Sequence, residues 1–241
     1  MDNPSSHYAV APSHYELSLD KKITTSRLYA ENPKEFTEKS KHKALECMRH
    51  CTGWCSLEKG GFLVDLVLKY QPDIIVEIGV WGGKSLVPMA SALKAIGKGI
   101  AYGIDPWENS ESVKWTKDEA NLEFWSRVDH QWVLNDLSNK IEQFELCDQI
   151  QLIKSTSEEA PLIQDIDLLH VDGNHSEETS LFDVKKWVPL VRSGGWIVLD
   201  DVHWFEKGKY TTAKAAEWLD DHCIRIAEFT DQSDWAVWVK P

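Results

Sequence analysis

Residues 76–85, with the sequence VEIGVWGGKS, are the stretch that decides the fold expected for this chain. The stretch completes a short apolar run, 74–78, and continues as a turn that contains Gly79, Gly82 and Gly83. An apolar strand that leads into a glycine-containing turn is typical of the first strand of an α/β sheet, where small residues let the backbone approach a ligand. The stretch therefore predicts a ligand site at the carboxyl end of this strand.

Further segments of strand length follow the first one. Four of them are the apolar runs 100–104, 150–153, 166–171 and 196–199. Short apolar runs that alternate with helical stretches are typical of a parallel sheet covered on both faces. The last two segments, 223–229 and 235–239, flank the turn TDQSD and predict an antiparallel hairpin. We therefore expect an α/β fold with a doubly wound, mostly parallel seven-stranded sheet that ends in this hairpin.

The regions outside the strands divide the chain into an N-terminal part and one large domain. Residues 1–56 are expected to form a polar arm followed by a helix over 33–51. Residues 57–241 are expected to form the sheet-containing domain, which begins with a helix over 58–70. The segment 107–148 is longer than one connecting helix needs, so we expect it to fold as a helical lid over the edge of the sheet.

The composition excludes several classes of protein. The 241 residues include 26 Lys and Arg against 39 Asp and Glu, a formal charge of −13, and the basic residues form no segregated face. A chain this acidic repels a phosphate backbone, so nucleic acid is not an expected partner. No apolar run of about 18 residues occurs, and residues 1–25 lack the apolar core of a secretion signal. We therefore expect no membrane span and a cytoplasmic location.

Three of the five cysteines, Cys47, Cys51 and Cys55, are spaced four residues apart. This spacing lines one face of a helix, whereas zinc-binding cysteines usually come in tight C-x2-C turns. We expect a half-buried stripe of small residues rather than a metal site, because free cysteine is commonly buried.

The turn after the first strand is the first clue to the ligand. A dinucleotide-binding turn reads G-x-G-x-x-G and binds a pyrophosphate, but Glu77 stands where its first glycine belongs. A carboxylate repels a pyrophosphate and attracts a cation. At the end of the second strand, in AYGIDPW, Asp105 is placed to bind both hydroxyls of a ribose. The two residues together indicate a nucleoside that has no phosphates but carries a positive centre.

These motifs resemble those of the class I S-adenosylmethionine-dependent methyltransferases, in which E-x-G-x-x-x-G is followed by an acidic residue after strand two. The resemblance covers roughly residues 57–240 and implies a Rossmann-like domain that binds S-adenosylmethionine. It implies that Glu77 and Gly79 support the methionine end, that Asp105 holds the ribose, and that QLIKSTSEEA supplies the adenine side. The cofactor contacts that it implies are Glu77, Gly79, Trp81, Gly82, Gly83, Ser85, Asp105, Pro106, Trp107, Ser157 and Asp172.

The expected lid holds four of the twelve tryptophans, namely Trp107, Trp115, Trp125 and Trp132. They suit either an aromatic wall for a sugar or aromatic substrate or ordinary packing. The spacing of Trp125 and Trp132 favours packing on one buried helix face for these two. Trp107, beside Asp105, is expected to neighbour the adenine.

Three carboxylates follow the fourth and fifth strands. Asp172 lies in LLHVDGNH, and Asp200 and Asp201 lie in GGWIVLDDVHW. Because neighbouring parallel strands end at the same edge of a sheet, these groups should converge, and they would repel each other unless a cation lay among them. Oxygen ligands of this kind select Mg2+. The alternative is that Asp200 or Asp201 caps the turn that follows its strand.

The pattern D-G-x-H after strand four and D-D after strand five is similar to that of the metal-dependent O-methyltransferases that act on sugars of macrolide and aminocoumarin antibiotics. This resemblance implies Asp172, Asp200 and Asp201 as Mg2+ ligands and His175 as the general base, with Asp172 at the catalytic centre. The metal would lower the pKa of a substrate hydroxyl, and His175 would accept its proton. His203 is the second candidate for the base, although a structural role in its loop is favoured for it. His170 is expected to be a hydrogen-bonded core histidine.

Three classes of function therefore stand open. A Mg2+-dependent O-methyltransferase acting on a small sugar or diol is the leading one, and a metal-free methyltransferase of nitrogen or carboxylate is the second. A nicotinamide-dependent oxidoreductase is third, because Glu77 occupies the place of a required glycine. The acceptor is expected to be a small molecule of undetermined identity, and assembly into a homo-oligomer through the N-terminal arm is left open.

Overall fold

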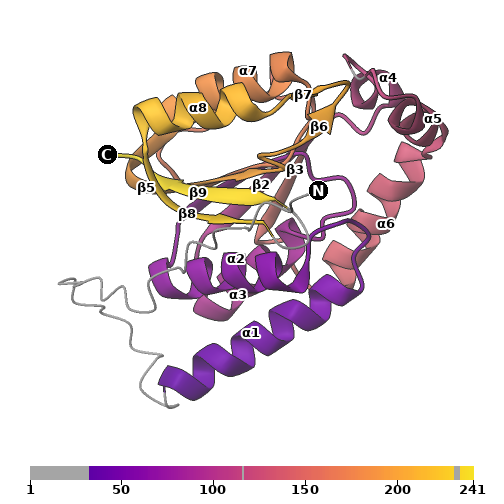
Figure 1. Ribbon diagram of the computed structural model, residues 1–241. Helices are drawn as coiled ribbons and strands as arrows, with labels where there is room; N and C mark the ends of the chain where they lie inside the picture. Colours follow the sequence, from indigo (N-terminus) through magenta and orange to yellow (C-terminus); the bar gives the residue numbers. More distant parts are fainter. Residues whose placement is uncertain (1–32, 116, 231–233) are drawn as a thin grey trace, which may run out of the picture.

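The computed structural model of the chain describes residues 33–115, 117–230 and 234–241, and a seven-stranded sheet lies at the centre of this part (Figure 1). Its strands are β1 (Ile74–Ile78), β2 (Ile100–Asp105), β3 (Ile150–Lys154), β4 (Ile166–Val171), β5 (Val191–Asp200), β8 (Ile224–Phe229) and β9 (Trp235–Val239). Their order is β3-β2-β1-β4-β5-β9-β8. The first five run parallel, whereas β9 pairs antiparallel with both β5 and β8. The predicted mostly parallel sheet with a C-terminal hairpin is confirmed.

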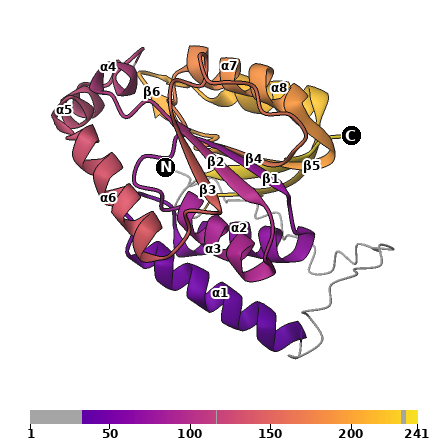
Figure 2. The same ribbon diagram turned by 180° about the vertical axis from the view of Figure 1, so that it is seen from behind.

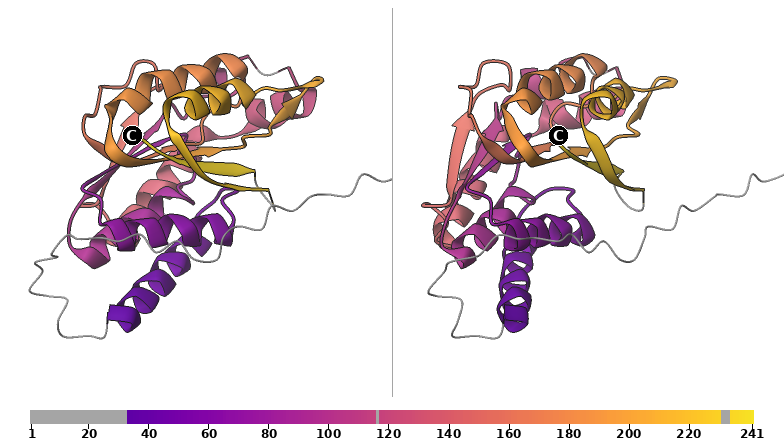
Figure 3. Two further views of the ribbon diagram at one scale, coloured as in Figure 1. Left: turned by 60° about the vertical axis from the view of Figure 1, so that its left-hand side comes forward. Right: turned by 90° about the vertical axis from the view of Figure 1, so that its left-hand side faces the viewer.

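Helices cover both faces of the sheet. One face carries α1 (Pro33–Arg49), α2 (Leu57–Tyr70), α3 (Leu86–Ile96) and α6 (His130–Gln143), and the other carries α7 (Glu177–Trp187), the 3-10 turn η1 (Val188–Leu190) and α8 (Ala213–His222). Figures 1 and 2 show these layers from the front and from behind. In Figure 3, α1 is the element farthest from the sheet, and it packs on α2 and α3. Among the described helices, none combines the length and apolar character that a bilayer crossing requires.

The two layers follow from the alternation of side chains along each strand. Ile75 in β1 belongs to the hydrophobic cluster shared with α2 and α3, whereas its neighbour Val76 belongs to the cluster under α7 and α8. In β5, Val198 and Ile197 divide in the same way. Successive residues of a strand point to opposite faces, so near-continuous apolar runs are what a sheet covered on both sides requires.

Strand β5 is longer than the apolar run 196–199 that predicts it, because it begins at Val191. Its first half contains Ser193, Gly194 and Gly195, which carry no apolar signal. Backbone hydrogen bonds to the C-terminal segment hold this half in place: Gly194 N donates to Lys240 O at 2.8 Å, and Lys240 N donates to Gly195 O at 3.0 Å. Val191 is buried, but the residues between it and Trp196 are held by main-chain pairing and form no continuous apolar run, so periodicity does not reveal the extension.

The chain order of the strands creates a crevice at the carboxyl edge of the sheet. From β1 the chain moves outward to β2 and β3, and it then returns to the other side of β1 to form β4. Ligands of open α/β sheets bind at such a reversal, outside the carboxyl ends of the strands. A short hairpin, β6 (Phe205–Glu206) with β7 (Lys209–Tyr210), follows β5 near the same edge (Figure 1).

The segment between β2 and β3 forms the expected helical insertion. It contains α4 (Asn109–Ser112) and α5 (Glu119–Arg127), neither of which buries a residue, and then α6, which packs its apolar stripe into the core. Figure 2 shows α4 and α5 at the edge where the parallel strands end. The part that covers the crevice is therefore α4 and α5. The expected polar arm lies outside the described residues over 1–32.

The lid tryptophans do not share one buried helix face. Trp125 lies on α5 and Trp132 on α6. The two helices are separate because Asp129 caps the start of α6, where its carboxylate accepts a hydrogen bond from Trp132 N. Trp132 is 57% exposed, so the expected core packing is wrong for this residue. Trp125 is half-buried and stacks at 6.0 Å between ring centroids against His130.

The cysteine stripe lies in the protein interior. Cys47, Cys51 and Cys55 are free and buried, and the first two join the core cluster beneath α3. Burial raises the pKa of the Cys51 and Cys55 thiols to about 12, so neither is a thiolate at neutral pH. The burial of all three cysteines agrees with the expected packing role.

Candidate functional site

A cavity of about 1020 Å³ opens at the carboxyl edge of the sheet. Its walls come from the turn after β1, the loops after β2, β4 and β5, the segment 52–55 before α2, and the lid helices α4 and α5. Ligand pockets for drug-sized molecules are commonly about 300–1,000 Å³. This cavity therefore has room for a nucleoside cofactor and a second small molecule together.

The glycines of the β1 turn serve two different purposes. Gly79 has φ +84°, and a Cβ there would lie 2.0 Å from the backbone oxygen of Asp172, so only glycine lets the ends of β1 and β4 approach this closely. Gly82 and Gly83 lie outside the cavity wall. A Cβ would meet Thr52 O at 2.4 Å from Gly82 and Leu137 Cδ1 at 2.4 Å from Gly83. These two make room for packing behind the turn.

Glu77 lies behind the turn rather than in the cavity wall. It is fully buried, and its Oε1 accepts a hydrogen bond of 2.7 Å from Ser85 Oγ. Its Oε2 lies 3.4 Å from Nδ1 of His170. His170 is buried as expected, but among the described residues neither of its ring nitrogens has a hydrogen-bond partner, so the expectation of a hydrogen-bonded core histidine is wrong. Ser85, by contrast, lines the cavity.

Asp105, the last residue of β2, lines the cavity and accepts three backbone hydrogen bonds. Its carboxylate accepts backbone hydrogen bonds from Val80 N at 3.0 Å, Trp81 N at 2.9 Å and Trp107 N at 2.7 Å. Burial raises the pKa of this carboxyl, although the three N–H donors oppose the shift. Asp105, Pro106 and Trp81 line the cavity.

Trp107 does not line the cavity. It is 3% exposed, and its Nε1 donates to the backbone oxygen of Trp81 at 2.9 Å. The structure therefore places Trp107 as a brace for the β1 turn rather than as a neighbour of a bound base.

The cavity wall near Gly173 contains a carboxyl group, that of Asp183 on α7, which the sequence pattern does not single out. Ser157 also lines the cavity, and its Oγ donates to Oδ1 of Asp183. Asp183 is 1% exposed, and burial raises its pKa to about 7. The sequence does carry a signal for Asp183, because a carboxyl group there shares the buried face of α7 with Val184 and Trp187.

A histidine and two carboxylates line the cavity at the ends of β4 and β5. Nε2 of His175 lies 3.0 Å from Oδ2 of Asp201, with side-chain exposures of 27% and 25%. One ligand-type atom each from Asp172, His175 and Asp201 fall within 4.8 Å of one another, and all three residues line the cavity. The ring of His175 also packs against Trp204, with centroids 4.5 Å apart. His203 is absent from the cavity wall and contacts Glu228 at 3.4 Å instead.

The side chain of Lys59, near the start of α2, lies between the carboxylates of Asp172 and Asp200. Its side chain is 1% exposed, its Nζ lies 3.3 Å from Oδ2 of Asp172, and it forms an ion pair with Oδ2 of Asp200. Burial alone would lower the pKa of Lys59, but the two carboxylates outweigh burial and raise it. Lys59 in turn keeps the pKa of Asp200 low despite burial, whereas burial and the charge of Asp200 raise the pKa of Asp172.

Sequence reasoning missed Lys59, although its position carries a signal. Lys59, Leu63 and Leu66 fall on one face of α2, and all three are buried. A lysine on the apolar stripe of a helix is unusual, because lysine is almost never fully buried without a partner. Its partners here are more than 100 residues away along the chain.

The three aspartates do not fit the Mg2+ site that the sequence predicts. Mg2+ requires near-octahedral oxygen ligands at about 2.0–2.1 Å. The Nζ of Lys59 is bonded to both Asp172 and Asp200, so it takes up the gap that an ion bridging these two residues would need. The other grouping, Asp172 with His175 and Asp201, contains an imidazole, which is a poor ligand for Mg2+. The methyl transfer considered below therefore contains no step on a metal ion.

Several aromatic side chains also line the cavity. Trp54, from the segment before α2, stacks on Trp81 with centroids 4.5 Å apart and 15° between the ring planes. Phe124 and Trp125 of α5 contact the edge of Trp54 at 5.7 and 5.8 Å. Trp115 lines the same cavity and is 55% exposed. Of the two alternatives for the lid aromatics, a cavity wall fits Trp115 and Trp125, which line the cavity together with Trp54 and Trp81. The sequence pattern did not identify Trp54.

Two polar ties connect the lid to the rest of the cavity. Nδ2 of Asn174, in the loop after β4, donates to the backbone oxygen of Lys114 at 2.9 Å and to that of Glu111 at 3.3 Å. Glu206 in β6 accepts from the backbone N–H groups of Lys117, at 2.6 Å, and Asp118. Both ties bond to main-chain groups, so they fix the path of the segment between α4 and α5.

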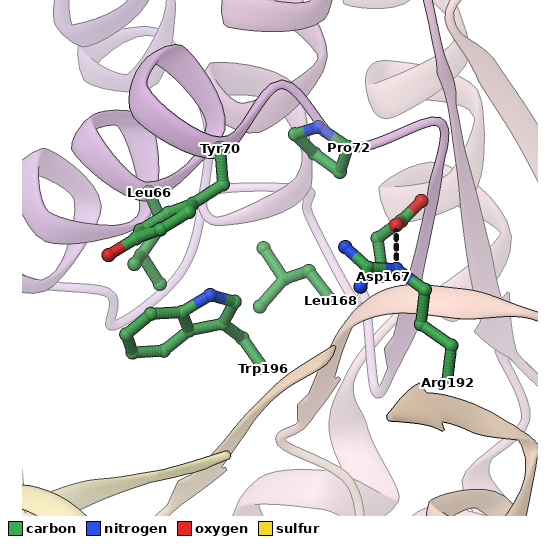
Figure 4. A pocket seen from close by; sticks show the side chains of 7 residues that line it. All are labelled: Leu66, Tyr70, Pro72, Asp167, Leu168, Arg192 and Trp196. Carbon is green, nitrogen blue, oxygen red and sulfur yellow. Dashed lines mark hydrogen bonds and ion pairs between the residues drawn. The ribbon is translucent and has the colours of Figure 1, made fainter. Parts of the chain in front are cut away.

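A second hollow, at the opposite edge of the sheet, is too small for a ligand. Figure 4 shows Tyr70 and Trp196 packed beside the ion pair of Arg192 with Asp167. The hollow measures about 10 Å³. A cavity needs roughly 10–15 Å³ to hold one water molecule, so this one is a packing defect.

The fold and the cavity define a class I methyltransferase, because a β3-β2-β1-β4-β5 parallel order with a C-terminal antiparallel hairpin encloses a nucleoside-sized site at the switch point. Residues 76–202 match the model of a family described as a methyltransferase domain, which is more than half of the chain. The chain belongs to this methyltransferase domain family and is an S-adenosylmethionine-dependent methyltransferase in family and fold.

Solved structures with the same fold include several O-methyltransferases. The O-methyltransferase NovP is 14% identical, with 87% of this chain and 99% of that chain covered and a TM-score of 0.60. TomG from Streptomyces achromogenes, an O-methyltransferase involved in tomaymycin synthesis and solved with SAM, is 16% identical over 89% and 92%, with a TM-score of 0.57. An O-methyltransferase from Bacillus cereus, solved with SAH, is 15% identical over 89% and 94%, with a TM-score of 0.55.

Proposed function

We propose that this protein transfers a methyl group from S-adenosylmethionine to a hydroxyl of a small molecule, with His175 as the general base. The observation that carries the proposal is the pairing of His175 with Asp201 on the wall of a cavity whose other end is organised by Asp105. A base held by a carboxylate beside a nucleoside site is the arrangement that activation of a hydroxyl requires. The O-methyltransferases among the similar structures support the same reaction class.

The cofactor is proposed to lie along the ends of β1, β2 and β4. The Asp105 carboxylate would bind the ribose hydroxyls, the main chain at Gly79 and Trp81 would face the methionine part, and Ser157 would contact the adenine. Asp183, hydrogen-bonded to Ser157, would complete the adenine end. Glu77 supports this site from behind through Ser85.

When bound, S-adenosylmethionine supplies an electrophilic methyl group on a sulfonium. The chain's own part is to bind the acceptor, exclude water and take its proton. Oδ2 of Asp201 lies 3.0 Å from Nε2 of His175 but is not aligned for a hydrogen bond among the described residues. Its negative charge would still favour the tautomer protonated at Nε2, which would leave Nδ1 to accept the hydroxyl proton. As the oxygen–carbon bond forms, the carbon–sulfur bond breaks, S-adenosylhomocysteine leaves, and the proton on His175 is released to solvent. Alignment of the two bound molecules supplies much of the rate.

The acceptor is proposed to be a sugar, a diol or an aromatic compound. Trp54, Trp81 and Phe124 present ring faces and edges to the cavity, and such surfaces bind the apolar faces of sugars and aromatic rings. Asp172 and Asp201 also line the cavity and would provide acceptors for hydroxyl protons.

An amine acceptor is the second candidate. The cavity wall includes Glu111, Glu158 and Glu178 in addition to the aspartates, and this excess of carboxylates attracts a cationic molecule. Transfer to nitrogen would use the same donor site and the same histidine.

Calorimetry with S-adenosylhomocysteine tests the donor site first, and absence of binding contradicts the proposal. Turnover of 13C-methyl-labelled S-adenosylmethionine with sugar, phenol and amine acceptors then tests the reaction. The carbon chemical shift of the transferred methyl group separates an O-methyl from an N-methyl product. Products that carry only N-methyl groups would replace the leading candidate by the second one.

A further inference from the structure

Lys59 is the most deeply buried charged side chain near the cavity that the proposed reaction does not use. It lies in the first turn of α2, where Ser56 caps the helix by accepting a hydrogen bond from Lys59 N at 3.1 Å. Its side chain is 1% exposed and does not line the cavity. The ammonium contacts Asp172 and Asp200 at once, and these two residues come from neighbouring strands of the sheet. A lysine held this way cannot bind substrate, so its role concerns the carboxylates.

The carboxylate cluster needs a cation, and Lys59 supplies one. Asp172 and Asp200 face each other beside the cavity, and two carboxylates at this range repel strongly when neither is neutralised. Asp201 has its own partner, His175. Asp172 and Asp200 are therefore the two carboxylates that still lack a cation, and the ammonium of Lys59 contacts both of them. A divalent ion between Asp172 and Asp200 would need the same space and would be repelled by the charge already there.

The position of the ammonium is fixed by the packing of α2. A Cβ at Gly60 would lie 2.4 Å from Sδ of Met48, which is fully buried, so α2 packs closely on the Met48 side chain of α1. The capping bond from Ser56 fixes the helix end as well. Helix movement that would withdraw Lys59 and open the gap to a metal is thus opposed by two independent contacts.

We propose that the Lys59 ammonium replaces a divalent metal in this site: it holds Asp172 toward the cavity, excludes Mg2+ from the gap between Asp172 and Asp200, and makes methyl transfer independent of added metal. Lys59 is a positioning residue, because it acts through Asp172. Only the independence of methyl transfer from added metal rests on the proposed function. The exclusion of metal is a property of the protein alone.

The first test is metal binding by the wild-type protein. Electron paramagnetic resonance titration with Mn2+ should detect no stoichiometric site in the wild type at millimolar ion. Activity should be unchanged by EDTA. A stoichiometric Mn2+ site in the wild type that disappears in Asp200→Asn overturns the proposal, as does activity that EDTA abolishes and Mg2+ restores.

The second test removes the ammonium without removing the bulk of the side chain. Lys59→Met should create a site for one Mn2+ per chain, and it should lower kcat about tenfold or more with little change in KM for S-adenosylmethionine. Lys69→Met, the same change at an exposed position of α2, is the matched control and should do neither. A Lys59→Met protein that folds, binds no Mn2+ and keeps wild-type kcat contradicts the proposal.

Loss of a buried ion-pair partner can unfold a protein, so a third variant is needed. The double variant Lys59→Met with Asp200→Asn leaves no unpaired charge in the gap, and it should fold without gaining the Mn2+ site. If Lys59→Met does not fold, the wild-type titration still decides the question. Binding of S-adenosylhomocysteine is measured in parallel, and its absence would refute the donor site without bearing on metal exclusion.

Discussion

The imidazole of His175 and the carboxylate of Asp201 lie 3.0 Å apart at the ends of two adjacent strands, and both line the cavity. We expect His175→Ala to lower kcat by roughly 10²–10⁴-fold, the usual contribution of a general base. The affinity for S-adenosylhomocysteine, measured by calorimetry, should stay within a few-fold of the wild type. A variant with full kcat would remove His175 from the mechanism.

Asp201 should act through His175 rather than independently. Asp201→Asn is expected to lower kcat less than His175→Ala does, and the double variant should be no slower than His175→Ala alone, because groups that act as a unit are not additive. His203→Ala is the control, since His203 contacts Glu228 outside the cavity wall. Additive losses in the double variant would contradict the pairing.

Gly79 should tolerate no side chain. In Gly79→Ala the new Cβ would lie 2.0 Å from the backbone oxygen of Asp172, so β1 and β4 must separate where the cavity begins. We expect a loss of about 3 kcal/mol or more in the free energy of unfolding, measured with urea, and weaker binding of S-adenosylhomocysteine.

Gly97→Ala provides the matched control for this steric effect. Gly97 also has a positive φ, +76°, but a Cβ there would meet nothing within 4 Å. Its cost should be limited to backbone strain of about 1–2 kcal/mol. Equal losses at the two positions would show that backbone conformation, and not the approach of the two strands, governs Gly79.

Asp183 should give the ligand-free protein a pH-dependent stability. Burial raises its pKa from 3.8 to about 7 in the folded chain, so between these values the folded state retains a proton that the unfolded chain releases. The stabilising effect is full below pH ~4 and is lost as the pH rises toward ~7, at about 1.4 kcal/mol per pKa unit. Asp183→Asn should therefore match the wild type near pH 4 and exceed it by a few kcal/mol at pH 8, in urea unfolding.

Ser157→Ala tests the assignment of this pH dependence. The hydrogen bond from Ser157 lowers the pKa of Asp183, so its removal should extend the loss of stability to higher pH. A difference between wild type and Asp183→Asn that does not vary with pH would mean that another group titrates in this range.

Asn174 should control the mobility of the lid. Its Nδ2 donates to the backbone oxygens of Lys114 and Glu111, and its Oδ1 accepts from Ser176 N. Asn174→Asp keeps the acceptor for Ser176 and replaces the donor with a carboxylate that repels the two carbonyls. We expect faster hydrogen exchange over 109–115 and a several-fold higher KM for S-adenosylmethionine.

The control for the lid is Asn135→Asp, the same change on the exposed face of α6. It should leave exchange over 109–115 unchanged. Unaltered exchange in Asn174→Asp as well would mean that the Glu206 contacts alone hold the lid.

The sheet could be predicted from the sequence because its signals are local. Each run such as 74–78 carries its own burial pattern, and Gly79 marks a turn by residue type alone. The first half of β5 was missed because Gly194 and Gly195 pair through the main chain, which leaves no pattern in the side chains.

The site was predictable only in part, because only some of its residues are placed by local signals. Asp105 is the last residue of β2, and Asp172 and His175 lie in the loop that follows β4, so their place at the carboxyl edge follows from topology. Asp183 lines the cavity from a helix, and Lys59 contacts the carboxylates beside the cavity from another helix. Their partners lie 26 and 113 residues away along the chain. A sum of charges can require a cation among converging carboxylates, but only the packing of α2 determines that the cation is a lysine.

The stacked rings of Trp54 and Trp81 give the protein an optical reporter of its own. Two indoles at 4.5 Å with nearly parallel planes couple their electronic transitions, and one of them, Trp54, is 64% exposed on the cavity wall. A molecule that inserts beside this pair changes both the coupling and the polarity around the exposed ring. Occupancy of the cavity can therefore be followed by tryptophan emission and near-ultraviolet circular dichroism, without a label and before any acceptor is known.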